Sequence, residues 1–286
     1  MTTTRRSNWA AGVRTTALLA TLTGLFVVIG FAIGGASTAL LFLFFGAAMN
    51  LGAWWFSDRI ALKMSGAQPL EESDAPQIYS MTRELTDQAK MPMPKMYVIP
   101  QAQPNAFATG RNPDNSAVAV TAGIVRLLSP DELRGVIAHE LAHIRNRDTL
   151  IQSVAATIGG AITYLAYMFM WFGSDNNSPI GLIGSLAMII LAPLAASLIQ
   201  MSISRQREFS ADATGAQISG NPEGLASALL RLEQGAQDIP MEVNQATECM
   251  YIVKPLSGKG LAGLFSTHPP IEDRVERLRQ MRPTLG

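Results

Sequence analysis

The chain has 286 residues, of which 48% are hydrophobic and 15% are charged, and its formal net charge is zero. A chain without net charge and without a basic block argues against nucleic acid as a partner, and the single cysteine, Cys249, excludes an intrachain disulfide. The hydrophobic fraction is too high for an ordinary soluble enzyme and too low for a chain wholly inside a bilayer, so we expect a protein with both membrane and soluble parts.

The first apolar segment follows a short basic N-terminus, residues 1–14. Residues 15–57 contain no charged side chain. Because one membrane-spanning helix needs about 20 apolar residues, this length predicts a hairpin of two transmembrane helices. The expected turn lies at residues 34–37, Gly-Gly-Ala-Ser, and Trp54-Trp55 is the expected anchor at the membrane surface. A cleaved signal peptide is the alternative, but a second apolar run follows at once without a polar mature start.

Residues 58–148 have the composition of a soluble domain. Their patterns predict an amphipathic helix over 75–90, strands over 96–99 and 116–121, and a helix that begins near Pro130. The start of that last helix is marked by Ser129, by the proline that follows it and by two acidic residues in the first turn.

The helix from Pro130 carries the motif His139-Glu-Leu-Ala-His143. Positions i and i+4 of a helix share one face, about 5–6 Å apart at Cβ, so the two histidines can bind one metal ion. Glu140 is placed to reach a water that the metal activates rather than the metal itself. Histidines on helices are often ordinary core residues, but the chain has only three, so chance rarely produces this spacing. The motif predicts a zinc hydrolase.

Residues 149–204 contain two further uncharged segments joined by a polar loop at 174–179. Each segment has about 25 residues, enough to span a bilayer with some tilt, so a second transmembrane hairpin is predicted. A pair of buried helices in a soluble core is the alternative, which their length and lack of charge disfavour. Lys and Arg flank the same ends of all four predicted spans, so the N-terminus and both soluble parts are expected in the cytoplasm.

Residues 205–286 form the second part of the predicted soluble domain. A membrane hairpin returns the chain to the side that it left, so Glu208 and Asp212, four residues apart on a predicted helix, can approach the zinc helix. Catalytic zinc usually has three protein ligands and a water, which makes Glu208 the candidate third ligand and Asp212 a candidate acceptor for a histidine ring N–H. An exposed acidic helix face is the alternative. Residues 220–237 predict another helix, 238–267 a loop, and a charged helix ends near Gln280.

These motifs, in this order, resemble the HtpX-type membrane metalloproteases, which are bacterial heat-shock quality-control enzymes, and more distantly the CAAX prenyl endoproteases. The similarity covers essentially the whole chain and includes Asn-Ala-Phe-Ala-Thr-Gly, His-Glu-Leu-Ala-His, Glu-Phe-Ser-Ala-Asp and Thr-His-Pro-Pro. The resemblance implies one Zn²⁺ held by His139, His143 and Glu208, with Glu140 as general base and acid. It also implies that Asp212 orients a ligand histidine, that His268 and Asn105 lie in the active site, and that Arg274 supports it.

The fold expected from the resemblance is an α-helical membrane protein with about four transmembrane helices and a mainly α, minor β zincin-type protease domain of the α+β class. We expect a multi-pass protein of a bacterial inner membrane, with its active site facing the cytoplasm. The expected partners are the lipid bilayer and protein substrates, chiefly membrane proteins. The sequence does not decide whether the chain forms a homo-oligomer. The resemblance also implies that an extended substrate adds to the strand at 116–121.

Three alternatives to this function have weaker support in the sequence. The prenyl endoproteases have more membrane spans than the four found here. A protease that cuts within the membrane would need its His-Glu pair inside an apolar span, whereas this motif lies among charged residues. A catalytically silent membrane scaffold that keeps a metal for structure would have no need of Glu140.

Overall fold

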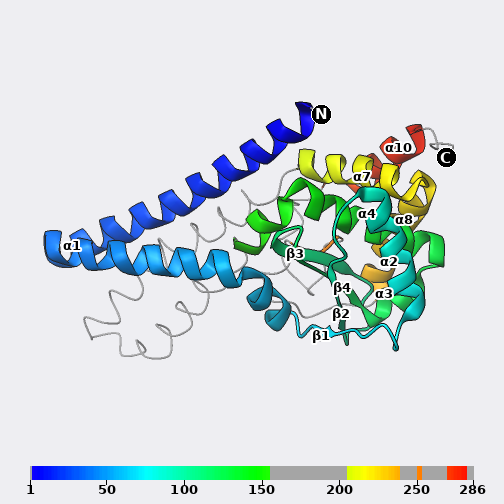
Figure 1. The fold of residues 1–286 in the computed structure, drawn as a ribbon, viewed down its shortest axis with the longest axis horizontal. Helices are drawn as coiled ribbons and strands as arrows, with labels where there is room; N and C mark the ends of the chain where they lie inside the picture. The colour runs from blue at the N-terminus through cyan, green and yellow to red at the C-terminus, as the bar shows by residue number, and fades with distance from the viewer. Residues whose placement is uncertain (1, 155–204, 239–249, 253–268, 282–286) are drawn as a thin grey trace.

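Two long helical arms that meet at a sharp bend form one end of the molecule (Figure 1). The computed structural model describes residues 2–154, 205–238, 250–252 and 269–281. Both arms belong to α1 (Thr2–Met64), which loses helical backbone geometry at Gly34 and Gly35, within the predicted turn. Gly35 has φ 69° and ψ −156°, a conformation that is essentially restricted to glycine. The Asn50 amide donates a hydrogen bond to the Thr23 hydroxyl at 2.8 Å and joins the two arms.

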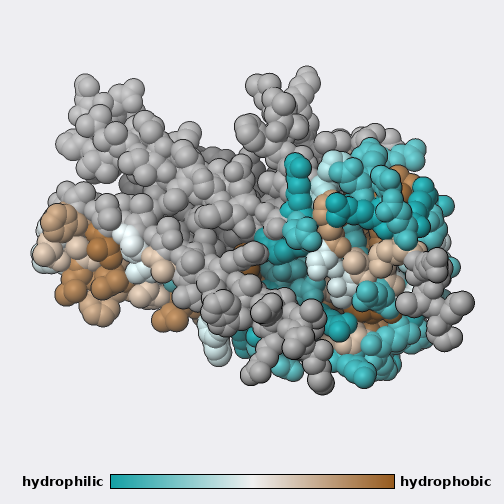
Figure 2. Space-filling view, turned by 90° about the horizontal axis from the view of Figure 1, so that it is seen from above, coloured by the Kyte–Doolittle hydropathy of each residue, from teal (hydrophilic) through white to brown (hydrophobic). Residues whose placement is uncertain are grey.

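The second arm of α1, Gly34–Met64, is the one helix in the described ranges that is long and apolar enough to cross a membrane. Large apolar side chains are exposed along it, and they form the brown surface at the left of Figure 2. These side chains include Leu40, Leu41, Phe44, Phe45 and Leu51. The count of four transmembrane helices stays a prediction, and most of the second predicted hairpin, residues 155–204, lies outside the described residues.

A small mixed sheet lies beside the end of α1. Its strands are β1 (Gln68–Pro69), β2 (Lys95–Ile99), β3 (Ala106–Asn112) and β4 (Asn115–Thr121), in the order β1-β2-β4-β3. β2 runs parallel to β4, and the other two pairings are antiparallel. The predicted strands at 96–99 and 116–121 are confirmed, whereas β3 was not predicted because small and polar residues fill its centre.

The order of the strands corrects one expectation about substrate binding. β4 has β2 on one side and β3 on the other, so its backbone groups are already used on both sides. The prediction that a substrate strand adds to residues 116–121 is therefore wrong. Within the described residues, β3 is the edge strand that lies on that side of the sheet.

Further helices in the described ranges are α2 (Pro76–Ala89), α3 (Ala122–Leu127), α4 (Pro130–Asn146), α7 (Arg205–Ser219), α8 (Pro222–Asp238) and α10 (Ile271–Gln280), and residues 148–154 are also helical. The fold is thus mainly helical with a minor sheet, as predicted. At the start of α4, the Ser129 hydroxyl accepts from the Glu132 amide and the Glu132 carboxylate accepts from the Ser129 amide. This reciprocal cap satisfies two amides that the helix leaves free and fixes where the histidine motif begins.

The two faces of the sheet contribute to different parts of the core. Ala106 and Ala108 of β3 belong to the cluster that contains the apolar residues of α4. Phe107 belongs to a second cluster with the end of α1, and its ring meets that of Tyr251 edge to face at 5.3 Å. Alternate residues of a strand point to opposite faces, so β3 lies between α4 and α1.

Helix α7 packs against α4 directly over the histidine motif, and a glycine makes this contact possible. A Cβ atom at Gly215 would lie only 2.9 Å from the Cα and backbone N of His139. The backbones of the two helices therefore approach more closely than any other residue would allow. This approach brings the first turns of α7, with Glu208 and Asp212, to the metal motif.

The variant Gly215→Ala is expected to lower the free energy of unfolding by about 1–3 kcal/mol, because the added methyl forces the helices apart. Zinc affinity should fall with it, since the same shift moves Glu208. Thermal unfolding and zinc stoichiometry of the purified protein measure both effects. Gly52→Ala in α1, where a Cβ has nothing within 4 Å, is the matched control and should keep or raise the stability, because alanine favours a helix more than glycine does. Equal stability of both variants would contradict this account of the packing.

Candidate metal centre

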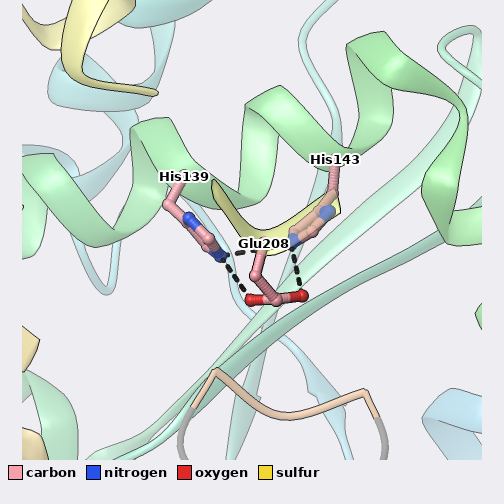
Figure 3. A group of neighbouring side chains, drawn as sticks. All are labelled: His139, His143 and Glu208. Carbon is pink, nitrogen blue, oxygen red and sulfur yellow. Dashed lines mark hydrogen bonds and ion pairs between the residues drawn. The ribbon is translucent and has the colours of Figure 1, made fainter. Parts of the chain in front are cut away.

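Two helices bring three buried side chains together at one point (Figure 3). His139 and His143 extend from α4, and Glu208 reaches them from α7. The two Nε2 atoms are 3.1 Å apart, and the Glu208 carboxylate oxygens lie 3.7 Å from Nε2 of His139 and 3.5 Å from Nε2 of His143. The three side chains, each at most 4% exposed, all direct a metal-ligand atom to the same small volume.

These distances fit a tetrahedral metal ion. Zinc binds histidine nitrogen and carboxylate oxygen at about 2.0–2.2 Å, so two ligand atoms of a tetrahedral site are about 3.3–3.6 Å apart. The three observed separations lie close to that range. Two imidazole lone pairs directed at each other would otherwise repel, and a cation between them removes that cost. The donor set of two histidines and one carboxylate is also one that catalytic zinc uses.

A carboxylate contacts the Nδ1 atom of each histidine, the ring nitrogen that does not face the proposed metal position. Nδ1 of His139 is 2.9 Å from Oδ1 of Asp212, and Nδ1 of His143 is 3.3 Å from Oδ2 of Asp148. A carboxylate at Nδ1 favours the tautomer with its proton there and leaves Nε2 free for a metal. Asp212 was predicted for this position, but Asp148 was not.

Arg274 of α10 is fully buried behind the site and fixes Asp212 in place. Its guanidinium donates from Nε to Oδ2 of Asp212 at 2.8 Å and from Nη2 to Oδ1 at 2.7 Å. Nη1 lies 3.7 Å from Oε2 of Glu208. Such a two-pronged contact restricts both the distance and the orientation of the Asp212 carboxylate. The structure thus places Arg274, which the resemblance implies as a supporting residue, in polar contact with Asp212 and close to Glu208.

The buried charges shift the acid–base properties of the site in different directions. Burial lowers the pKa of His139 and outweighs its hydrogen bond to Asp212. Burial alone would lower the pKa of His143 too, but the carboxylates of Glu208 and Asp148 outweigh it and raise that pKa to about 9. Burial would raise the pKa of Asp212, yet the Arg274 guanidinium holds it at about 2. The surplus of negative charge around the two rings therefore attracts a cation.

Glu140 lies between the metal ligands and the sheet. Its carboxylate is 2% exposed and accepts a hydrogen bond from the Ala108 amide of β3. Burial raises the pKa of Glu140 to about 7, although His143 and the Ala108 amide oppose this shift. A carboxylate with a pKa near neutrality both accepts and releases a proton readily, which suits a general base and acid.

Two further predicted residues have different outcomes. Asn105 is fully buried directly before β3, where its backbone pairs with Thr121 and its side-chain oxygen accepts from the Ala106 amide. It thus precedes the strand whose amide contacts Glu140. His268 lies outside the described residues.

Backbone groups along the outer side of β3 complete the surroundings of the metal centre. The Ala106 carbonyl accepts from the Ile252 amide, the Ala108 amide donates to Glu140, and the Gly110 carbonyl accepts from the Thr149 hydroxyl. The same Ile252 offers its carbonyl to Arg274 at 3.3 Å. No short sequence motif marks such backbone contacts, so sequence reasoning missed them.

Comparisons with known proteins agree with this geometry. The profile of Peptidase family M48 matches residues 72–282. A Protease HtpX homolog of Syntrophobacter fumaroxidans is 53% identical over 277 residues, covering 94% of this chain and 98% of that protein. A Protease HtpX homolog of Persephonella marina is also 53% identical, over 283 residues and 98% of its length. The crystal structure of S. mikatae Ste24p has a similar fold, with a TM-score of 0.51 at 19% identity over 96% of this chain and 66% of that one.

Proposed function

The chain belongs to peptidase family M48, and from this membership we propose that the protein cleaves misfolded or damaged membrane proteins at the cytoplasmic face of a bacterial inner membrane. The resemblance to HtpX-type proteases is confirmed by relatives about 50% identical over nearly the whole chain. The protein is accordingly a membrane zinc metalloprotease. Its proposed role is membrane protein quality control under stress.

The observation that carries the proposal is the buried carboxylate of Glu140, which interacts with His143 and Glu208 of the three-residue cluster. His139, His143 and Glu208 are the proposed zinc ligands, and bound zinc supplies a Lewis acid that polarises the scissile carbonyl and lowers the pKa of water. Glu140 takes a proton from the attacking water as the water oxygen bonds to the carbonyl carbon. It then delivers this proton to the amide nitrogen as the C–N bond breaks.

The substrate is proposed to bind as an extended strand along the outer side of β3. Peptides commonly add to a free sheet edge through main-chain hydrogen bonds, with limited dependence on sequence. The outward carbonyls of Ala106 and Gly110, which accept from the Ile252 amide and the Thr149 hydroxyl in this structure, are the acceptors that such a peptide would take over. Because the Ala108 amide holds Glu140, a peptide on β3 would lie next to the proposed base. Broad recognition of unfolded segments suits a quality-control protease.

The remaining predicted residues keep proposed roles. Asn105 and His268 are proposed to lie near the tetrahedral intermediate, where His268 or another donor would offset the oxyanion charge, an interaction that is worth about 3–4 kcal/mol in other hydrolases. Asp212 is proposed to orient His139, and Arg274 to hold Asp212. The exposed apolar side chains of Gly34–Met64 support an anchor in the bilayer, with the zinc site close to its surface.

The function is tested with the full-length protein in lipid vesicles. A destabilised membrane protein should be cleaved at exposed segments, a zinc chelator should abolish cleavage, and added zinc should restore it. The folded form of the same substrate should be cleaved much more slowly. Chelator-resistant turnover would contradict the zinc mechanism, and preference for a prenylated C-terminal peptide would contradict the proposed substrate class.

A further inference from the structure

Asp148 lies beside the metal centre although no sequence motif places it there. Its Oδ2 atom is 3.3 Å from Nδ1 of His143, and both side chains are almost fully buried. The contact has the same form as that between Asp212 and His139, in which a carboxylate faces Nδ1 while Nε2 faces Glu208. The two histidines are thus held in equivalent ways, each by a carboxylate at Nδ1.

The backbone after α4 takes an unusual course that makes this contact possible. On a continuous helix, a residue five positions after His143 would lie about 140° around the axis, away from the histidine face. Arg147 instead adopts a left-handed conformation with φ 60° and ψ 29°. This conformation is uncommon for a residue other than glycine and costs on the order of 1 kcal/mol. The turn returns Asp148 to the side of α4 on which His143 lies.

The segment after this turn is attached to the edge strand, which keeps Asp148 in place. Residues 148–154 are helical. The Thr149 hydroxyl donates to the Gly110 carbonyl at 3.0 Å, and the hydroxyls of Ser153 and Thr109 are 2.7 Å apart. All four residues are buried, so these two contacts attach the helix that carries Asp148 to β3.

We propose that Asp148 is a positioning residue for zinc: its carboxylate accepts the Nδ1–H of His143 and thereby aims Nε2 at the metal. The inference rests on the zinc site proposed above. An orienting partner of this kind typically contributes 10- to 100-fold to metal affinity, about the effect expected here. It also explains why the strained turn at Arg147 is present, since a relaxed helix would leave His143 without its carboxylate.

The competing reading is that Asp148 only caps the helix of residues 148–154. Two substitutions separate the readings, because Asn and Ser cap helices about as well as Asp. Asp148→Asn keeps the shape but loses the negative charge, and Asp148→Ser keeps a capping oxygen but cannot reach His143. Asp87→Asn, at an exposed position of α2, is the matched control.

The experiment measures zinc affinity of the full-length protein by competition with a chelator, the visible spectrum of its cobalt form, and thermal unfolding of the metal-free protein. Both Asp148 variants should bind zinc about 10- to 100-fold more weakly and alter the cobalt spectrum, with metal-free unfolding close to wild type. The control variant should match wild type throughout.

Two results would overturn the inference in distinguishable ways. Unchanged zinc affinity and cobalt spectrum in both Asp148 variants would show that Asp148 does not position His143, while the proposed function stands. A wild-type protein that binds neither metal would remove the zinc site itself and the inference with it.

Discussion

Glu140→Gln is expected to reduce peptide hydrolysis by about 10²- to 10⁴-fold while zinc stays bound. The amide has nearly the shape of the carboxylate, so it fills the same buried space beside β3 and the Ala108 amide keeps an oxygen to bind. It cannot accept a proton from water at neutral pH. The loss should therefore appear in kcat, with little change in KM.

The measurement is steady-state cleavage of an unfolded membrane substrate, together with the zinc content of the same preparation. Glu84→Gln is the matched control, because Glu84 lies on the surface of α2 in an exposed ion pair with Arg134 and should keep full activity. Turnover of the Glu140 variant within a few fold of wild type would remove Glu140 from the reaction. Loss of zinc from it would assign Glu140 a structural role instead.

Glu208→Gln is expected to weaken zinc binding by more than about 100-fold, which exceeds the effect of losing an orienting partner. Glu208 is the one carboxylate in the triad, and both of its oxygens face the histidine nitrogens. The amide removes a negative charge from a buried site, so the attraction for a divalent cation falls in a region of weak screening. Hydrolysis should be lost with the metal.

Competition against a chelator gives the dissociation constant of the Glu208 variant. Unfolding with and without zinc gives a second readout, because a ligand at about 100 times its Kd stabilises the folded state by about 2.7 kcal/mol. That zinc-dependent increase should disappear in the variant. Glu223→Gln, in an exposed ion pair on α8, is the control. Full zinc occupancy at unchanged affinity would exclude Glu208 as a ligand.

Local spacing was sufficient to predict one half of the metal site. His139 and His143 share a helix face by their separation alone, and Ser129 marks the start of that helix, which its cap confirms. Predicting Glu208 and Asp212 required a further assumption: that the second membrane hairpin returns the chain to the membrane face on which the histidine helix lies. Their place beside α4 depends on the packing of α7, which Gly215 permits and no local pattern reveals.

The parts that sequence reasoning missed depend on backbone conformation and long-range contact. β3 lacks the alternation of a half-buried strand because both of its faces are covered, by α4 on one side and α1 on the other. Asp148 was missed because helical periodicity places it on the wrong side of α4, and only the left-handed turn at Arg147 corrects this. Neither feature has a local signature.

Ile252 competes with a substrate peptide for the Ala106 carbonyl of β3. The Ile252 amide already occupies the Ala106 carbonyl, and Arg274 holds the Ile252 carbonyl from the other side. A peptide that adds to this edge must displace that contact before it gains the same hydrogen bond. Its apparent affinity is therefore the intrinsic affinity scaled by the fraction of molecules in which Ala106 is free. Short or rarely exposed segments would meet a closed edge, whereas a long unfolded segment with many contacts would open it.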